Sequence, residues 1–397
     1  MEDKKVKQEL AGYVPLEKVE KILAETVDRT GADIEVLNTV EEYCSRLITG
    51  DGKRFRVAVP YIMAKGLDID LSEEELLKVL IPLEVIHGLS LIQDDVMDQD
   101  QVRRGLETPH EKFKSIGFSR RQAESLATLD VMHLQSIVQR SVLKLDIQHE
   151  KKMEVAEILD RVLEDISRGQ MLDIAGESIY RGEKFREMLS GKDESFEYLK
   201  FYEEVVARKT TPLIKAGPRI LEVISGKELG NLKKYAEQLG KAFQVRDDIL
   251  DITGGEEEIG AGEGLEQEIG KDRFSDLLEG TVTLPVYYAI QELQDGFTKN
   301  REFIEGLDKD SGREELETEY GSSRKFLKHV LRKKEPEAWE LKLAGKMVES
   351  SDALKRAEDE ARGYAEEAAG ELEASPVNGK EKMLLEQLAY FAATRSK

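Results

Sequence analysis

The sequence predicts an all-α protein. Apolar residues recur at helical spacing through most of the 397 residues, and few runs show the alternation of a half-buried strand. Prolines number only 9 and aromatic residues make up only 6% of the chain, which is unusual for a sheet protein. With 40% hydrophobic residues, a chain of this length can bury a large core, as one domain or as two smaller ones.

The clearest helix precedes an acidic cluster. Ser72 and Glu75 have the spacing of a capping box, so we expect a helix from about Glu73 to the aspartates that begin at Asp94. Pro82 removes one backbone hydrogen bond within it and is expected to kink it. One apolar stripe is predicted, formed by Leu76, Leu80, Leu83 and Ile86.

A second helix is predicted before another acidic cluster, with Leu232, Ala236, Leu239 and Phe243 on one face. The following residues 254–270 are rich in Gly and Glu and are expected to form a mobile insertion, either a lid or a neutral loop. Residues 291–346 are dense in charge and carry the only tryptophan, Trp339, without a chemical motif, so we expect solvated helices there.

Net charge and cysteine content restrict the class of protein. The formal net charge of -22 argues against nonspecific binding to nucleic acid or to an anionic membrane surface. No apolar run is long enough for a membrane span, and the first residues lack the apolar core of a signal peptide. The single cysteine, Cys44, excludes an intramolecular disulfide. We therefore expect a cytoplasmic protein with no nucleic-acid partner and no transmembrane segment.

Two copies of the pattern D-D-x-x-D end the two predicted helices. They are Asp94, Asp95 and Asp98, and then Asp247, Asp248 and Asp251. Residues four apart share a helix face, so Asp94 pairs with Asp98, and like charges at that spacing cost roughly 0.2–0.5 kcal/mol per pair without a cation. Carboxylates in ones and twos suit Mg²⁺, which substrate phosphates often complete. One such cluster is usually solvated, but two behind apolar helices favour a metal-bridged phosphate site.

Basic residues that could hold those phosphates occur in three places. Lys53, Arg54 and Arg56 follow two glycines, Arg103 and Arg104 are adjacent, and Arg208 and Lys209 precede Thr210. Glycines before a helix start also expose backbone N–H groups to anions. Each group alone is more often surface charge than a site. Together with the paired acidic motifs, they predict diphosphate binding.

In this order, the motifs resemble those of the trans-isoprenyl diphosphate synthases, or polyprenyl synthetases. They are G-K-R-x-R (Gly52 to Arg56), H-x-x-S-L-x-x-D-D-x-x-D (His87 to Asp98), R-R-G (Arg103 to Gly105), G-Q-x-x-D (Gly169 to Asp173), K-T (Lys209 and Thr210), F-Q-x-x-D-D-x-x-D (Phe243 to Asp251), a segment from Gly270 to Pro285, and the C-terminal "LLEQLAYFAATR". The sequence departs from the family pattern at Val57, Gln93 and Thr281, where proline, histidine and lysine are frequent.

The resemblance implies a fold, a reaction and partners. The fold would be the isoprenoid synthase fold, one helical domain of residues 1–397 around a central cavity, and the chain would form a homodimer. The reaction would be the head-to-tail (1'-4) condensation of isopentenyl diphosphate with an allylic diphosphate, which could be dimethylallyl, geranyl or farnesyl diphosphate. The cofactor would be Mg²⁺, with three ions present when substrate is bound.

The resemblance also implies roles for individual residues. Asp94 and Asp98 would ligate two Mg²⁺ ions and Asp247 a third, with Asp95, Asp248 and Asp251 completing or supporting these shells. Arg103 would contact the allylic diphosphate, and the isopentenyl diphosphate would be held by Lys53, Arg56, His87 and Arg104. Lys209, Thr210 and Gln244 would lie along the reacting allylic segment, and Lys271 would close over the leaving group.

Product length is predicted from Leu89 and Ser90, which lie about one helical turn, ~5.4 Å, before Asp94. Short-chain members often place an aromatic residue there as the floor of the tunnel. We therefore expect a product longer than farnesyl diphosphate, with geranylgeranyl diphosphate first and a longer chain second. Alternatively, Leu89 packs in the helix core and another residue, such as Met132, sets the depth.

Three other functions remain open. An inactive partner subunit of a heteromeric synthase would usually have lost aspartates, whereas all six are present here. A terpene cyclase would not need the second diphosphate site that Lys53, Arg56 and Arg104 indicate. An unrelated helical scaffold would have no use for the ordered motifs.

Overall fold

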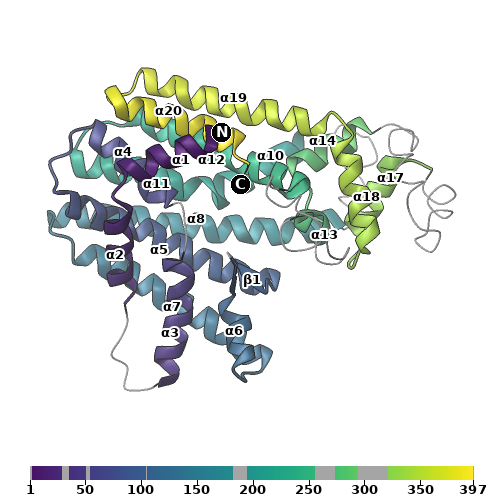
Figure 1. The fold of residues 1–397 in the computed structure, drawn as a ribbon, viewed down its shortest axis with the longest axis horizontal. Helices are drawn as coiled ribbons and strands as arrows, with labels where there is room; N and C mark the ends of the chain where they lie inside the picture. Colours follow the sequence, from purple (N-terminus) through teal and green to yellow (C-terminus); the bar gives the residue numbers. More distant parts are fainter. Residues whose placement is uncertain are drawn as a thin grey trace. The chain divides into compact units, whose positions relative to one another are not determined.

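The computed structural model describes residues 2–28, 35–50, 54–103, 105–181, 195–254, 273–293 and 321–396. These residues form two compact units (Figure 1). Unit 1 comprises Met1–Ile166, Thr211–Glu237 and Ala369–Leu388, and unit 2 comprises Ser167–Thr210, Gln238–Ala368 and Ala389–Lys397. The expectation of one domain over the whole chain stays a prediction.

In its described residues, unit 1 has helices and one short hairpin. Its elements are α1 (Glu2–Tyr13), α2 (Leu16–Val27), α3 (Glu35–Thr49), α4 (Phe55–Gly66), α5 (Glu73–Asp98), β1 (Val102–Arg103), β2 (Leu106–Glu107), α6 (Pro109–Ser115), α7 (Arg120–Leu143) and α11 (Thr211–Ser225). The first part of α8 (His149–Arg181), the start of α12 (Gly230–Thr253), the end of α19 (Ala353–Glu373) and most of α20 (Gly379–Thr394) also belong to it.

Unit 2 is built from helices alone in the part of the chain that the structure describes. It contains the remaining residues of α8, α12, α19 and α20. Its other helices are α10 (Ser195–Lys209), α13 (Ser275–Glu279), α14 (Leu284–Glu292), α17 (Ser323–Arg332) and α18 (Ala338–Glu349). The predicted all-α class is therefore confirmed. No described helix is both long enough and apolar enough to cross a lipid bilayer.

Helix α5 is the central element of unit 1. It begins at Glu73 behind the predicted capping box, in which the Ser72 hydroxyl accepts from the Glu75 N–H and the Glu75 carboxylate accepts from the Ser72 N–H. It packs against α2, α3, α4, α7 and α11 (Figure 1). The four residues of the predicted apolar stripe are all buried, but the buried surface is wider than one stripe, because nearly every residue from Leu76 to Leu89 is buried. Only Glu74 and Lys78 on the first turns, and residues of the last turns, are exposed to solvent.

The second predicted helix is α12, whose residues Leu232, Ala236 and Leu239 are fully buried as expected. Phe243 is only half-buried, and the guanidinium of Arg395 lies over its ring at 4.0 Å from the centroid. The expected insertion at 254–270 lies outside the described residues except for Gly254. Within the charge-dense region 291–346, α17 and α18 are not merely solvated: Phe326, Val330, Leu341 and Met347 are buried.

Candidate active site

The first acidic motif lies on the last turns of α5, where the helix emerges from the core. Asp94 is half-buried and Asp98 is exposed, whereas Asp95 is 0% exposed. Residues four apart lie on the same helix face, so Asp94 and Asp98 face the same way, as the spacing predicts. Asp95 points into the protein. The motif therefore separates two accessible carboxylates from one buried carboxylate.

The buried carboxylate of Asp95 is paired with the guanidinium of Arg103 on β1. Arg103 also donates to an Asp100 oxygen at 3.0 Å. Burial raises the pKa of Asp95 to about 6, and the charge of Arg103 opposes this shift. Arg103 therefore binds two carboxylates in this structure, and its predicted contact with an allylic diphosphate stays a prediction.

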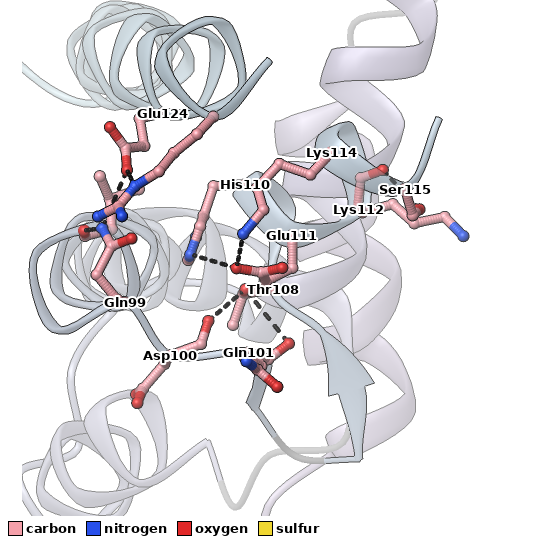
Figure 2. A network of polar contacts seen from close by, with 12 residues as sticks. Gln99, Asp100, Gln101, Thr108, His110, Glu111, Lys112, Lys114, Ser115 and Glu124 are labelled. Carbon is pink, nitrogen blue, oxygen red and sulfur yellow. Dashed lines mark hydrogen bonds and ion pairs between the residues drawn. The ribbon is translucent and has the colours of Figure 1, made fainter. Parts of the chain in front are cut away.

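A polar network fixes the turn that follows the motif (Figure 2). Gln99, in a left-handed conformation at φ 59°, ends α5, and its side-chain amide donates to the carbonyl of Val96 at 2.6 Å and to Glu124 at 3.2 Å. The Thr108 hydroxyl donates to the carbonyl of Asp100 at 2.6 Å. The hairpin that carries Arg103 is thus held at both ends.

His110 is the unusual member of this network. Its side chain is fully buried, and its Nε2 atom lies 3.6 Å from the Glu111 carboxylate, to which Lys114 also donates (Figure 2). Neither ring nitrogen has a hydrogen-bond partner among the described residues. Burial lowers the pKa of His110, because the charged imidazolium would lose its hydration. The histidine is therefore a neutral, packed side chain at neutral pH.

The predicted isopentenyl diphosphate residues are only partly described. Lys53, Arg104 and Lys271 lie outside the described residues. Arg56 lies on the first turn of α4, and its backbone N–H donates to the buried Glu84 carboxylate of α5 at 3.2 Å. His87 follows Glu84 by three residues on α5 and is half-buried. Within unit 1, Glu84 therefore links Arg56 and His87: it accepts from the backbone of Arg56 and lies about one helical turn before His87.

The second acidic motif lies on α12, within unit 2. Its middle residue, Asp248, is buried and accepts from the Tyr202 hydroxyl at 2.6 Å and from the Gln244 amide at 2.9 Å. Burial raises the pKa of Asp248 to about 7, and these two hydrogen bonds oppose the shift. Asp251 accepts from the backbone N–H groups of Ser275 at 2.9 Å and Asp276 at 3.3 Å.

Three predicted catalytic residues come together in unit 2, at the end of α10 and on α12. The Thr210 hydroxyl donates to the side-chain oxygen of Gln244, and the Gln244 amide NH₂ group donates to Asp248. The Lys209 ammonium donates to Asp173 on α8 at 2.5 Å. A Cβ added to Gly169 would lie 2.6 Å from the backbone nitrogen of Lys209, so the backbones of α8 and α10 are in direct contact there.

The donor set fits Mg²⁺ bound with phosphates rather than a complete protein cage. Among the described residues, no three His, Cys, Asp or Glu side chains converge as a full metal site requires. Mg²⁺ prefers hard oxygen ligands and is often held by one or two carboxylates, with waters and substrate phosphates completing its shell. Asp94 and Asp98 on α5, and Asp247 on α12, supply carboxylates of that kind.

The predicted chain-length residues lie one turn deeper on α5. Leu89 is 3% exposed, and the half-buried Ser90 donates to the carbonyl of His87 at 2.9 Å. Met132, the alternative, is 60% exposed on α7. Because α7 turns this side chain to the surface, Met132 does not line the interior of this chain, and which residue sets the product length stays a prediction.

Several residues that support the site were not predicted. Tyr202, which holds Asp248, follows no sequence pattern. Asp173 and Arg395 both stood in recognised segments, the G-Q-x-x-D motif and the C-terminal helix, but their partners Lys209 and Asp247 are distant in sequence. The segments were visible in the sequence, whereas the contacts required the fold.

Comparison with known proteins identifies relatives of this site. The family model described as Polyprenyl synthetase matches residues 37–320. Geranylgeranyl diphosphate synthase of Methanosarcina mazei is 30% identical over 249 residues, which cover 62% of this chain and 66% of that protein. Heptaprenyl diphosphate synthase component 2 of Geobacillus stearothermophilus is 30% identical over 254 residues, which cover 63% and 67%.

Solved structures show the same fold. Geranylgeranyl pyrophosphate synthase from Corynebacterium glutamicum, complexed with isoprenyl diphosphate and magnesium, superposes with a TM-score of 0.72. The match covers 96% of this chain and 98% of that chain, at 19% identity. At that identity, the likeness concerns the fold.

Proposed function

Because the chain belongs to the polyprenyl synthetase family, we propose that it is a Mg²⁺-dependent prenyltransferase that condenses isopentenyl diphosphate with an allylic diphosphate. The observation that carries the proposal is the polar chain in unit 2, in which Thr210, Gln244 and Asp248 are hydrogen-bonded in sequence beside Lys209. A scaffold protein would gain nothing from joining these residues to a metal-binding motif. The six aspartates of both motifs are intact.

In the proposed reaction, the C–O bond of the allylic diphosphate breaks and its electron pair leaves with diphosphate. The double bond of isopentenyl diphosphate then forms the new C–C bond with the allylic carbon, and a proton passes to the departed diphosphate. Asp94, Asp98 and Asp247 would hold Mg²⁺. When bound, Mg²⁺ would supply positive charge to the leaving group. Lys209 would add a fixed positive charge, and Thr210, whose hydroxyl donates to Gln244, would turn oxygen lone pairs toward the developing cation.

We propose geranylgeranyl diphosphate as the product, with a longer chain as the second candidate. Leu89, rather than an aromatic side chain, stands one turn before Asp94, so that position on α5 offers no ring to block a growing chain. The relatives include both a geranylgeranyl and a heptaprenyl diphosphate synthase. The chain length within this range is therefore decided by the test below.

The test is incubation of the purified protein with isopentenyl diphosphate, farnesyl diphosphate and Mg²⁺, followed by chromatographic sizing of the products. Condensation to geranylgeranyl diphosphate is expected. Asp94→Ala combined with Asp98→Ala should abolish it, whereas Asp70→Ala, an exposed aspartate just before α5, should not. Absence of condensation, or activity surviving in the double variant, would defeat the proposal.

A role as partner subunit of a heteromeric synthase is the second candidate, because one relative is named as a component. The same experiment separates the two, since a subunit of that kind is inactive alone. A homodimer is proposed on the evidence of α7, which exposes Leu129, Met132 and Leu143, and of Met153 on α8, each at least 55% exposed. Light scattering of the purified chain tests it. The cytoplasmic location stays a prediction.

A further inference from the structure

One basic residue of the G-K-R-x-R motif has no place in the proposed substrate site. Lys53 and Arg56 are assigned there to isopentenyl diphosphate, whereas Arg54 between them is only 4% exposed. Its backbone has a left-handed conformation, with φ 47° and ψ 34°, and it directly precedes α4. A buried arginine stabilises a protein only when its charge and its N–H groups are matched by protein acceptors.

The first partner of Arg54 is Glu20 on α2. Nε of Arg54 donates to one carboxylate oxygen at 2.6 Å, and a terminal nitrogen donates to the other at 2.8 Å. This is the two-pronged arginine-carboxylate pairing, which restricts orientation as well as distance. A lysine could not reproduce it, because its three donors share one nitrogen.

The second set of partners is the end of α3. Arg54 donates to the carbonyl of Ile48 at 2.9 Å and to the carbonyl of Gly50 at 2.7 Å. These carbonyls are among those that a helix leaves without intrahelical donors, and a cation is favourable at that end of the helix dipole. One side chain therefore joins the end of α3 to the residue that directly precedes α4.

Glu84 on α5 connects this arrangement to Arg56. One Glu84 oxygen lies 3.8 Å from a terminal nitrogen of Arg54, and the other accepts from the backbone N–H of Arg56 at 3.2 Å. Glu84 is 4% exposed. The start of α4 is thus connected through Arg54 and Glu84 to α2, α3 and α5. Every nitrogen of the Arg54 guanidinium donates to a protein oxygen, so its positive charge is neutralised within the protein.

We propose that Arg54 is a positioning residue for isopentenyl diphosphate. It does not touch the substrate. It joins the end of α3 to the first turn of α4, and so determines where Arg56 presents its charge to the diphosphate. This inference rests on the proposed function, because it requires that Arg56 binds isopentenyl diphosphate.

The test compares Arg54→Lys and Arg54→Gln with the wild type. Calorimetry measures the binding of isopentenyl diphosphate and of farnesyl diphosphate separately, and steady-state kinetics measure KM for each substrate and kcat. We expect the Kd and KM for isopentenyl diphosphate to rise about tenfold or more, since small displacements of a binding group have large effects. The values for farnesyl diphosphate should change less than about twofold. Relative to Arg54→Gln, Arg54→Lys should recover more of the lost stability than of the lost affinity for isopentenyl diphosphate.

Arg46→Gln is the matched control, because Arg46 forms an exposed ion pair with Glu42 on the same α3 and should leave both affinities unchanged. If Arg54→Gln fails to fold, Arg54→Lys and Glu20→Gln carry the same comparison. Equal weakening of both substrates, or a loss of kcat alone, would overturn the inference. A wild type that performs no condensation would instead overturn the proposed function, and its binding of isopentenyl diphosphate would still report on Arg54.

Discussion

The guanidinium of Arg395 is paired with the carboxylate of Asp247, the first aspartate of the second motif. Arg395 also lies over the Phe243 ring, and its carbonyl accepts from Arg246 at 2.6 Å. Three residues of α12 therefore hold one arginine. The side chain of Arg395 is 6% exposed and that of Asp247 is 46% exposed, so the carboxylate remains accessible while its charge is partly matched.

Arg395→Gln should strengthen divalent metal binding. Removing a positive neighbour makes the Asp247 carboxylate more attractive to a cation, by about two- to fivefold for a half-exposed pair. Titration with Mn²⁺ in the presence of inorganic diphosphate, followed by electron paramagnetic resonance, measures this directly. Arg356→Gln is the matched control, since Arg356 also stacks on an aromatic ring, Tyr288, and lies near an acid, Glu292. Unchanged or weaker Mn²⁺ binding in Arg395→Gln would contradict the expectation.

Gly169→Ala should lower kcat by about tenfold or more. The added Cβ would meet the backbone of Arg208 and Lys209, which cannot give way as a flexible side chain would, so α10 must shift and carry Lys209 with it. Initial rates at saturating substrate measure the effect. Gly363→Ala on α19 is the control, because nothing lies within 4 Å of its Cβ and alanine favours a helix. Equal activity of the two variants would show that α10 tolerates the displacement.

His110 should destabilise the protein as pH falls. Its pKa is lowered in the fold, so the unfolded chain takes up the proton first, and stability is lost as pH drops below about 6.5. The charged groups around it are Asp100, Glu111, Lys114 and Glu124. Asp95 has the opposite sign: its pKa is raised, so its contribution is lost as pH rises through about 6.

The difference between wild type and His110→Asn isolates the histidine, because Asp95 is present in both proteins. Urea unfolding at about pH 7.5 and about pH 5.5 should give a smaller stability advantage of the wild type at the lower pH. His149→Asn, an exposed histidine at the start of α8, is the control. A difference that does not change with pH would show that the pKa of His110 is the same in the folded and unfolded states.

Leu89→Phe should shorten the product, because an aromatic ring would then stand one turn before Asp94 at a buried position. Chromatography of the extracted prenyl alcohols measures the distribution. Met132→Phe should leave it unchanged, since Met132 is 60% exposed on α7. A product spectrum that Leu89→Phe does not alter would assign the depth of the tunnel to another residue.

Local patterns predicted the helices well, because their causes are local. The capping box of Ser72 and Glu75 placed the start of α5 correctly, since both hydrogen bonds lie within four residues. The width of the buried surface of α5 was not predicted, because it depends on α7 and α11, which are distant in sequence. The first motif was correctly predicted to end an apolar helix.

The roles of the arginines were harder to predict, because sequence patterns do not reveal which acids face them. Arg54 and Arg56 are indistinguishable as letters, yet Glu20 and Glu84 bury one of them. Arg103 was predicted to contact a diphosphate, and in the structure it binds the neighbouring Asp95 and Asp100. Residues that bind an anion and residues that neutralise a carboxylate carry the same charge. Only the packing separates them.

The hydrogen bonds on Asp248 also have a direction. Because this carboxylate accepts from the Gln244 NH₂ group at 2.9 Å, the amide oxygen of Gln244 is turned toward Thr210. The Thr210 hydroxyl must then donate its single hydrogen to that oxygen. Only its lone pairs remain for any other group that approaches. Through two successive hydrogen bonds, Asp248 thus determines that Thr210 can face an electron-poor carbon but cannot donate to a phosphate oxygen.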